Sequence, residues 1–240
     1  MEKTQLSSTQ GSGRLVTRDP SEITLMEQFK YDMMLYEAAI ELMKAKLQVL
    51  QEEFLCLTER SPIDHITTRI KSPESILEKL QRKNSPMTLQ SLKENVRDIA
   101  GVRIICPFLS DVYEVANILT RQNDVHLVQT KDYIQHPKEN GYRSLHVLIT
   151  VDVHLSSSVR EVPVELQIRT IAMNCWAGVE HQIRYKKNVE DAEMNEVLLR
   201  CARLMNEADT SLQQLIDKMP GMRDDFGVLS DEKQPCEPEG

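Results

Sequence analysis

The stretch EVPVELQIRT, residues 161–170, predicts the fold more firmly than any other part of this 240-residue chain. Apolar and polar side chains alternate along it, as on a β-strand with one face packed on a core. The apolar face carries Val162, Val164, Leu166 and Ile168. The polar face carries Glu161, Glu165, Gln167 and Arg169. A solvated sheet face is the simpler explanation of the polar row, and a site that uses these groups together is the alternative.

The flanking sequence extends this strand into a sheet. LHVLITVDV, residues 145–153, alternates in the same way, and the LSSSVR joint is too short for a helical crossover, so the two strands are expected to pair antiparallel. Further strands are expected at 99–108 and 125–133, and helices at 21–54, 73–83, 110–122, 170–185 and 190–218. The expected N-caps are Ser72, Thr88, Ser110 and Thr170. This order predicts an α+β fold with a mixed sheet, flanked by N- and C-terminal helices.

The composition indicates a single globular domain. Hydrophobic residues make up 40% of the chain and charged residues 28%, which suits a water-soluble core-forming protein. We expect the domain over residues 21–218, between a disordered stretch at 1–20 and an acidic flexible tail at 219–240. No window is apolar enough to span a membrane, and the first residues lack an export signal. Five scattered cysteines without a CxxC pair predict free thiols and a cytoplasmic location.

The charge is unevenly distributed along the chain. Residues 60–187 hold 18 Lys and Arg against 14 Asp and Glu, a net charge of +4; because the whole chain holds 29 and 37, the flanks hold 11 and 23, a net −12. A basic middle favours a local anionic ligand and argues against stable nucleic-acid binding, which needs a domain-wide basic surface. A solvated charged surface explains the charge alone equally well.

The segment TTRIKSPESILEKLQRK, residues 67–83, predicts a phosphate site. Its cations are Arg69, Lys71, Lys79, Arg82 and Lys83. They surround a helix whose first turn offers free backbone N–H groups and the Ser75 hydroxyl, and both the helix end and the cations attract phosphate. Because basic helices are common, this segment alone is a moderate indication.

The segment VRDIAGVRI, residues 96–104, contains a charge that is difficult to bury. Asp98 stands at the head of an apolar strand, and Arg103 lies within it, where an unpaired cation is costly. Arg103 is therefore either ion-paired, with Asp98 or Glu165, or laid flat against a planar ligand. Two isolated carboxylates can also hold Mg²⁺, whose shell is completed by phosphates and water.

Two further segments carry polar groups that a turn or a helix does not need. KENGYRSLH, residues 138–146, follows its Asn-Gly turn with Tyr142, Arg143 and His146. In the helix at 170–185, Asn174 and His181 lie on one stripe with Gly178 between them, which leaves room for a bound group. There is no P-loop motif, and no oxyanion-hole signature accompanies Ser144 and His146, so a P-loop enzyme and a hydrolase triad are both disfavoured.

Four ordered blocks resemble the synthetase domain of the RelA/SpoT family, specifically its stand-alone small alarmone synthetases. The blocks are TRIKSPESILEKLQRK, RDIAGVRIIC, DYIQHPKENGYRSLH and VPVELQIRTIAMNCWAGVEHQIRYK, within residues 61–187. The hydrolase half of long family members has no counterpart here. The resemblance implies a nucleotidyltransferase-like domain that moves the β,γ-pyrophosphate of ATP to the ribose 3′-hydroxyl of GTP or GDP, giving (p)ppGpp. It also implies Mg²⁺ and a homotetramer.

The resemblance implies a role for each polar position. ATP is expected at Arg69, Lys71, Ser75, Lys79, Arg82 and Arg103, with Arg69 and Arg103 on the two sides of the adenine. GTP or GDP is expected at Lys138, Tyr142, Arg143, His146, Gln167 and Asn174, with guanine stacked on Tyr142. Asp98 is the implied Mg²⁺ ligand. Glu165 is implied to orient or deprotonate the 3′-hydroxyl and to approach the metal.

His65 and Thr68 depart from one branch of these synthetases, in which a phenylalanine and a glycine at these places accompany activation by pppGpp. The chain therefore resembles the RelP-like branch, which lacks this activation. Two other functions stay open from the residues. One is a degenerate synthetase that binds guanine nucleotides or single-stranded RNA through Tyr142 and the basic helix. The other is a helical scaffold.

Overall fold

A mixed five-stranded sheet forms the centre of the protein. The computed structural model describes residues 24–58, 60–187 and 192–219. The strands lie in the order β1-β2-β5-β4-β3. Their bounds are β1 His65–Ile70, β2 Ala100–Cys106, β3 Val125–Asp132, β4 Leu145–His154 and β5 Val159–Thr170. Only β2 and β5 pair in parallel, and the β4–β5 pair is antiparallel as its short joint predicts. The predicted α+β class with a mixed sheet is confirmed.

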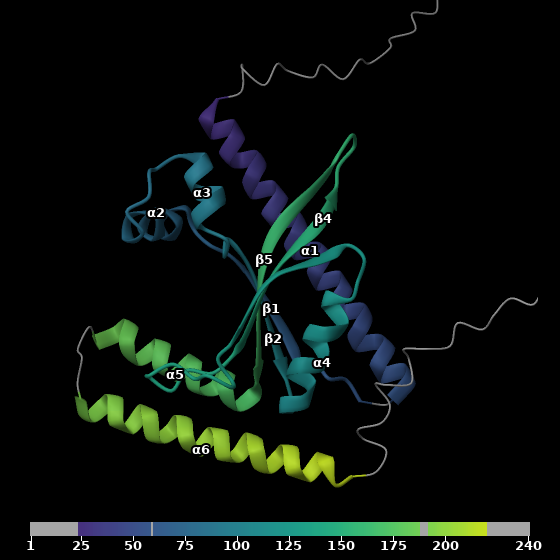
Figure 1. The fold of residues 1–240 in the computed structure, drawn as a ribbon, viewed down its shortest axis with the longest axis vertical. Helices are drawn as coiled ribbons and strands as arrows, with labels where there is room; N and C mark the ends of the chain where they lie inside the picture. The colour runs from purple at the N-terminus through teal and green to yellow at the C-terminus, as the bar shows by residue number, and fades with distance from the viewer. Residues whose placement is uncertain (1–23, 59, 188–191, 220–240) are drawn as a thin grey trace, which may run out of the picture.

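Helices surround this sheet on several sides. Their bounds are α1 Leu25–Thr58, α2 Pro73–Arg82, α3 Leu89–Asn95, α4 Leu109–Thr120, α5 Ile171–Lys187 and α6 Ala192–Asp217. In Figure 1, α1 and α4 lie on one side of the sheet and α2 and α3 on the other, while α5 and α6 run side by side at one end. The N- and C-terminal helices therefore flank the sheet as expected.

The alternating pattern of β5 places its apolar row in the core. Val164, Leu166 and Ile168 are fully buried, and Ala39, Met43 and Leu47 of α1 are buried in the same cluster. Burying a side chain of leucine or methionine size stabilises the fold by roughly 1.5–3 kcal/mol. This packing fixes the direction of β5, so that its polar row must lie on the opposite face of the sheet.

Strand β1 is an element that the sequence did not predict. Residues 65–70, HITTRI, lack the alternating apolar row that marks β4 and β5, and none of them is buried. The structure pairs this segment antiparallel with β2, from His65 opposite Ile105 to Ile70 opposite Ala100. Its backbone hydrogen bonds to β2, rather than any hydrophobic alternation of its own, make it an edge strand.

Three of the four predicted helix caps are confirmed. The hydroxyls of Ser72, Thr88 and Thr170 accept hydrogen bonds from the backbone N–H groups of residues 75, 91 and 173. Pro73 occupies the first position of α2, where its missing N–H costs nothing. Local sequence therefore determines where these three helices begin.

The fourth cap, at Ser110, is wrong. Helix α4 begins at Leu109, with Phe108 at the cap position and no side-chain cap. The first turn is held from a distance instead. Arg60 donates two hydrogen bonds, of 2.9 and 2.8 Å, to the buried Asp111 carboxylate, and the Ser110 backbone N–H donates to Gln213 of α6. These partners are remote in sequence, so a local pattern could not reveal them.

Several expectations lie outside the described residues. The disorder expected for residues 1–20 and the flexibility expected for the tail beyond residue 219 fall there, and the domain bounds stay predictions. Within the described part of the chain, no helix combines the length and the apolar character that crossing a bilayer requires.

Candidate active site

The strand register gathers the predicted polar residues into two rows across the polar face of the sheet. One row joins Thr67, Arg103, Gln167, His146 and Lys131, from β1 through to β3. The next row joins Arg69, Gly101, Glu165, Leu148 and Gln129. Residues that are about a hundred positions apart in the chain therefore lie side by side.

A cavity of about 320 Å³ lies over these rows, and we call it the catalytic cavity. Asp98 and Glu165 both line it. The cationic and imidazole side chains in its wall are Lys79, Lys83, Arg97, Lys131 and His146. Two carboxylates among several cations form a setting for polyphosphate and a divalent metal.

Asp98 is held by two lysines. Lys71 Nζ lies 2.6 Å from one carboxylate oxygen and Lys79 Nζ lies 2.7 Å from the other. Burial alone would raise the pKa of Asp98, but the two ammonium groups more than offset this and lower the pKa to about 2. Asp98 is therefore a carboxylate at neutral pH that is ion-paired to both lysines.

Glu165 is held by His146 and Gln167. His146 Nδ1 lies 3.2 Å from one carboxylate oxygen, and Gln167 Nε2 donates to the other at 2.9 Å. Burial and the nearby charge of Asp98 raise the pKa of Glu165, yet the contacts with His146 and Gln167 outweigh them, so the net effect is a lowered pKa. A carboxylate with a lowered pKa is a weak proton acceptor, which favours an orienting role over that of a strong base.

Tyr142 lies beside this group, in a half-buried aromatic cluster. Its hydroxyl is 2.8 Å from His146 Nε2, and its ring meets Tyr133 and Trp176 edge to face. Lys138 Nζ lies 4.8 Å from the centre of the Tyr142 ring. Tyr142 and Lys138 therefore lie next to His146, which contacts Glu165.

A second hollow, of about 170 Å³, lies between β1, β2 and β5, and we call it the arginine cleft. Arg69, Arg103 and Gln167 line it. Gly101 also lines the cleft, opposite Arg69 in the strand register. The cleft is the predicted adenine site.

Arg103 does not form the ion pair with Asp98 or Glu165 that was one of its two predicted alternatives. Asp98 is paired with Lys71 and Lys79, and Glu165 contacts His146 and Gln167. Its Nε atom is buried and has no hydrogen-bond partner among the described residues. Burial, Arg169 and Arg69 lower the pKa of Arg103. Of the two alternatives for this residue, the planar ligand is the one that the geometry favours.

Four predicted residues stay at the margin. Arg143 turns away, and its guanidinium donates to the Asn206 side chain of α6. Arg82 is exposed near the end of α2, Ser75 lies in the first turn of α2, and Asn174 is half-buried on α5. Their ligand contacts stay predictions.

Other residues join the site without having been predicted for it. Lys131 and Arg97 line the catalytic cavity, and Arg169 reaches the Tyr142 hydroxyl at 2.7 Å. Arg169 belongs to the polar row of β5, so the alternation pattern was the signal that could have added it. Nothing local marks Lys131, whose place comes from the β3–β4 register.

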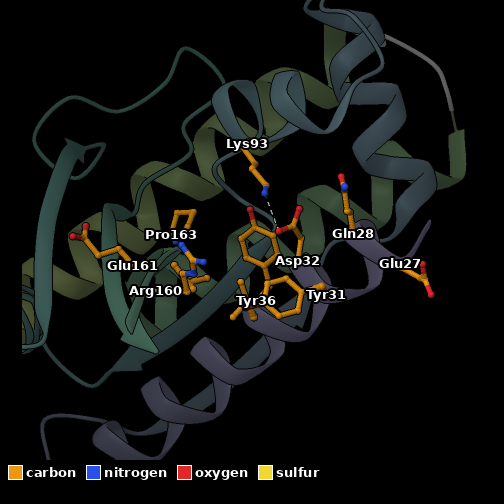
Figure 2. A pocket seen from close by; sticks show the side chains of 11 residues that line it. Glu27, Gln28, Tyr31, Asp32, Tyr36, Lys93, Arg160, Glu161 and Pro163 are labelled. Carbon is orange, nitrogen blue, oxygen red and sulfur yellow. Dashed lines mark ion pairs between the residues drawn. The ribbon is translucent and has the colours of Figure 1, made fainter. Parts of the chain in front are cut away.

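A larger cavity lies elsewhere. It measures about 650 Å³, and Figure 2 shows it between the start of α1, Lys93 of α3 and the start of β5. Its wall contains Tyr31, Leu35, Tyr36 and Pro163, and none of the predicted site residues. Size alone therefore does not identify the reactive cavity in this protein.

Comparison with known proteins identifies the family. The region found in RelA/SpoT proteins matches residues 68–190. The GTP pyrophosphokinase YwaC of Bacillus subtilis is 42% identical over 200 residues, which cover 83% of this chain and 92% of the relative. The chain belongs to the RelA/SpoT family. A second RelA/SpoT relative, the GTP pyrophosphokinase YjbM of Bacillus subtilis, is 37% identical over 81% of this chain and 90% of its own length.

Solved structures place the chain among the small alarmone synthetases of the RelA/SpoT family. Small alarmone synthetase 2 of Bacillus subtilis superposes with a TM-score of 0.73 at 39% identity, covering 80% of this chain and all of that one. Small alarmone synthetase 1 of Bacillus subtilis, bound to its product pppGpp, gives 0.74 at 34% identity, with 81% and 99% coverage. The RelA/SpoT region contains every residue that was predicted for the site.

Proposed function

We propose that this protein is a GTP pyrophosphokinase, which transfers the β,γ-pyrophosphate of ATP to the ribose 3′-hydroxyl of GTP or GDP and releases AMP. The observation that carries the proposal is that Asp98 and Glu165 line one cavity, with cations in its wall and the arginine cleft and Tyr142 beside it. Pyrophosphoryl transfer needs two polyanions brought into line, so positioning and charge stabilisation supply most of the catalysis.

The donor side would use the arginine cleft and the basic helix. Arg69 and Arg103 would hold adenine between their planar guanidinium groups, which also gives the buried Arg103 Nε a neighbour. Lys71 and Lys79 would transfer from Asp98 to the donor phosphates, together with Ser75 and Arg82. The two short ion pairs at Asp98 support this, because they hold both lysines against a carboxylate that lines the cavity.

The acceptor side would use the Tyr142 cluster. Guanine would stack on the Tyr142 ring, and Lys138, now placed over that ring, would neutralise acceptor phosphate together with His146. Gln167 and Asn174 would fix the acceptor. Arg143 would have to break its hydrogen bond to Asn206 before it could contact the acceptor phosphates.

Magnesium fits the donor set of the catalytic cavity. No group of three or more His, Cys, Asp or Glu gathers into a metal cage among the described residues, whereas Asp98 and Glu165 face one cavity. Mg²⁺ commonly takes one or two carboxylates and completes its shell with substrate phosphate and water. We propose Asp98, with Glu165, as the ligands, and the bound ion would neutralise charge on the transferred pyrophosphate.

Glu165 would orient the 3′-hydroxyl and receive its proton late in the transfer. Its lowered pKa makes early proton removal unfavourable. His146 and Gln167 hold the carboxylate from two sides, so its direction is fixed before the acceptor arrives.

We further propose a cytoplasmic homotetramer of the RelP-like branch that does not require pppGpp for activity. The four described cysteines are free thiols, as suits a reducing compartment. His65, in place of the phenylalanine of the activated branch, is an exposed side chain that contacts Asp64 at 2.7 Å.

A product assay tests the proposed function. Purified protein with Mg²⁺, ATP and GDP, GTP or GMP should release AMP and yield a 3′-pyrophosphorylated nucleotide, resolved by chromatography. Glu165→Gln and Asp98→Asn should each abolish turnover with unfolding temperatures close to that of the wild type. Glu161→Gln, exposed on the same strand and outside the site, is the matched control and should retain activity.

Other outcomes would select the alternative functions. Nucleotide or single-stranded RNA binding without AMP release would indicate a degenerate binding module. The absence of any thermal shift with nucleotide would indicate a scaffold. Wild-type rates in both carboxylate variants would mean that the catalytic roles are wrongly assigned.

A further inference from the structure

Five side chains of the site form a closed ring of hydrogen bonds. Tyr142 Oη meets His146 Nε2 at 2.8 Å, and His146 Nδ1 meets Glu165 Oε1 at 3.2 Å. Glu165 Oε2 accepts from Gln167 Nε2 at 2.9 Å. Gln167 Oε1 accepts from Arg169 at 3.2 Å, and the same Arg169 nitrogen donates to Tyr142 Oη at 2.7 Å, which closes the ring.

The chemistry of the members fixes the direction of every bond except the one between Tyr142 and His146. A guanidinium only donates, so the Tyr142 hydroxyl accepts from Arg169. Glu165 is a carboxylate and accepts from His146 Nδ1, whereas the direction of the contact between Tyr142 and His146 Nε2 depends on the His146 tautomer. Gln167 accepts from Arg169 through its oxygen and donates to Glu165 through its nitrogen. Both arms of the ring therefore lead from the cation Arg169 to the anion Glu165.

Arg169 is the most buried member of this ring. It is 5% exposed, and its hydrogen-bond partners in the structure are neutral oxygens of Tyr142, Gln167 and Ser144. Glu165 lies four residues, roughly 13 Å, along the strand from Arg169, and the hydrogen bonds of Arg169 go to these three residues and not to Glu165 itself. Its charge acts on the carboxylate through Gln167 on one side and through Tyr142 and His146 on the other.

We propose that Arg169 is a positioning residue for the acceptor nucleotide. It holds the Tyr142 ring, on which the acceptor base stacks, at a fixed place relative to Glu165, which orients the acceptor hydroxyl. The inference rests on the proposed function. It adds that the base end and the sugar end of the acceptor are recognised by one rigid unit, which lines the arginine cleft only through Gln167.

The decisive variant is Tyr142→Phe, which keeps the aromatic side chain for stacking and removes the hydroxyl that contacts Arg169 and His146. We expect the KM for GDP to rise about tenfold, the size typical of losing a hydrogen bond to a charged group, with the KM for ATP within about twofold of the wild type. Arg169→Met should produce the same split. Arg169→Lys keeps the positive charge but loses the planar guanidinium with its several N–H donors. The KM for GDP should therefore rise less in Arg169→Lys than in Arg169→Met.

A double variant separates positioning from general stability. If Arg169 acts through the Tyr142 hydroxyl, the effects of the two substitutions should overlap. The KM for GDP of the double variant Arg169→Met, Tyr142→Phe should then rise by less than the product of the fold-increases in the two single variants. The proposal is overturned if the two losses multiply, if the KM for ATP rises equally, or if Tyr142→Phe keeps the wild-type KM for GDP. The last two outcomes stand even if Arg169→Met does not fold.

Calorimetric titration of GDP alone separates this inference from the proposed function. The dissociation constant for GDP should be larger in Tyr142→Phe and in Arg169→Lys than in the wild type, whether or not pyrophosphate is transferred. A wild-type protein that binds GDP but releases no AMP would refute the proposed function and leave the ring testable. Unchanged GDP affinity in both variants, with normal AMP release by the wild type, would refute the inference alone.

Discussion

Gly141, at the tip of the loop that precedes Tyr142, satisfies two demands that no other residue meets. Its φ of +88° lies in the left-handed region, and a Cβ there would lie 2.7 Å from the Cβ of Ala202 on α6. The turn signal in the sequence explains the first demand. The second is a contact across about 60 residues of chain, and it fixes the loop against α6.

We expect Gly141→Ala to destabilise the protein by about 1–2 kcal/mol through the backbone conformation alone, with a further cost from the clash. The KM for GDP should rise because Tyr142 is the next residue. Urea unfolding and acceptor titration measure the two effects. Adding Ala202→Gly removes the clash but not the strain, so it should restore only part of the loss; complete restoration would argue against the backbone contribution.

Tyr36 is a buried residue of α1 that lines the 650 Å³ cavity, and it provides a pH prediction. Burial and the charge of Asp32 raise the pKa of Tyr36 from 10.0 to about 12. A raised pKa means that the folded state favours the neutral phenol. The contribution of neutral Tyr36 to the free energy of unfolding is therefore intact below pH 10 and is lost as the pH rises from 10 to 12.

Between about pH 9 and pH 12, the wild type should therefore lose about 2 kcal/mol more unfolding free energy than Tyr36→Phe, which has no phenol to ionise. Urea titrations at the two pH values test this. Tyr31→Phe, in the same cavity but 44% exposed, is the control and should lose stability as the wild type does. Equal losses in Tyr36→Phe and the wild type would contradict the prediction.

At the scale of elements, the short helix α3 separates the two large cavities. Lys93, on the side of the large cavity, pairs with the buried Asp32 of α1 at 2.9 Å (Figure 2). Glu94 and Asn95, at the end of the same helix, line the catalytic cavity. A seven-residue helix is too short to be stable alone, so its place depends on such ties.

We expect Lys93→Met to cost about 1–3 kcal/mol, because it leaves a buried carboxylate without its cation. The second oxygen of Asp32 already has no hydrogen-bond partner among the described residues. Thermal and urea unfolding provide the measurement. Lys44→Met, which removes an exposed i,i+3 pair with Glu41 on α1, is the matched control and should change stability by less than about 0.5 kcal/mol. Equal effects of the two variants would mean that the tie to α3 is unimportant.

The same scale shows why some elements were predicted and others not. Helices α2, α3 and α5 carry their own caps, and β5 carries its own alternation, so each was recognised from local sequence. Helix α4 begins with the help of Arg60 and Gln213, and β1 exists through its pairing with β2. Elements that depend on remote partners leave no local pattern.

At the scale of the whole molecule, the charge distribution predicts a salt effect. The chain has a net charge of −8, yet the catalytic cavity gathers Lys79, Lys83, Arg97 and Lys131 around two carboxylates. Exposed charges beyond about 10 Å are screened at 0.1 M salt. Attraction of anionic nucleotides by the cavity should therefore weaken as salt rises.

We expect kcat/KM for GDP to fall several-fold between about 50 and 300 mM KCl, with kcat nearly constant, since steering acts on association. Steady-state assays at fixed Mg²⁺ measure this. Lys131→Met should have a shallower salt dependence, whereas Lys44→Met, on the far helix α1, should keep the wild-type slope. A kcat that falls with salt as steeply as kcat/KM would show that steering is not the cause.

The sequence by itself determined the class of fold, the polar row of β5, the starts of α2, α3 and α5, and the family, because alternation, caps and ordered motifs are properties of neighbouring residues. Only the tertiary structure decided that Lys71 and Lys79 hold Asp98, that Arg143 turns to α6, and that Arg169 closes a ring through Tyr142, His146, Glu165 and Gln167. These contacts join different strands and helices. Their geometry is set by sheet register and helix packing, which are fixed only when the whole chain buries its core.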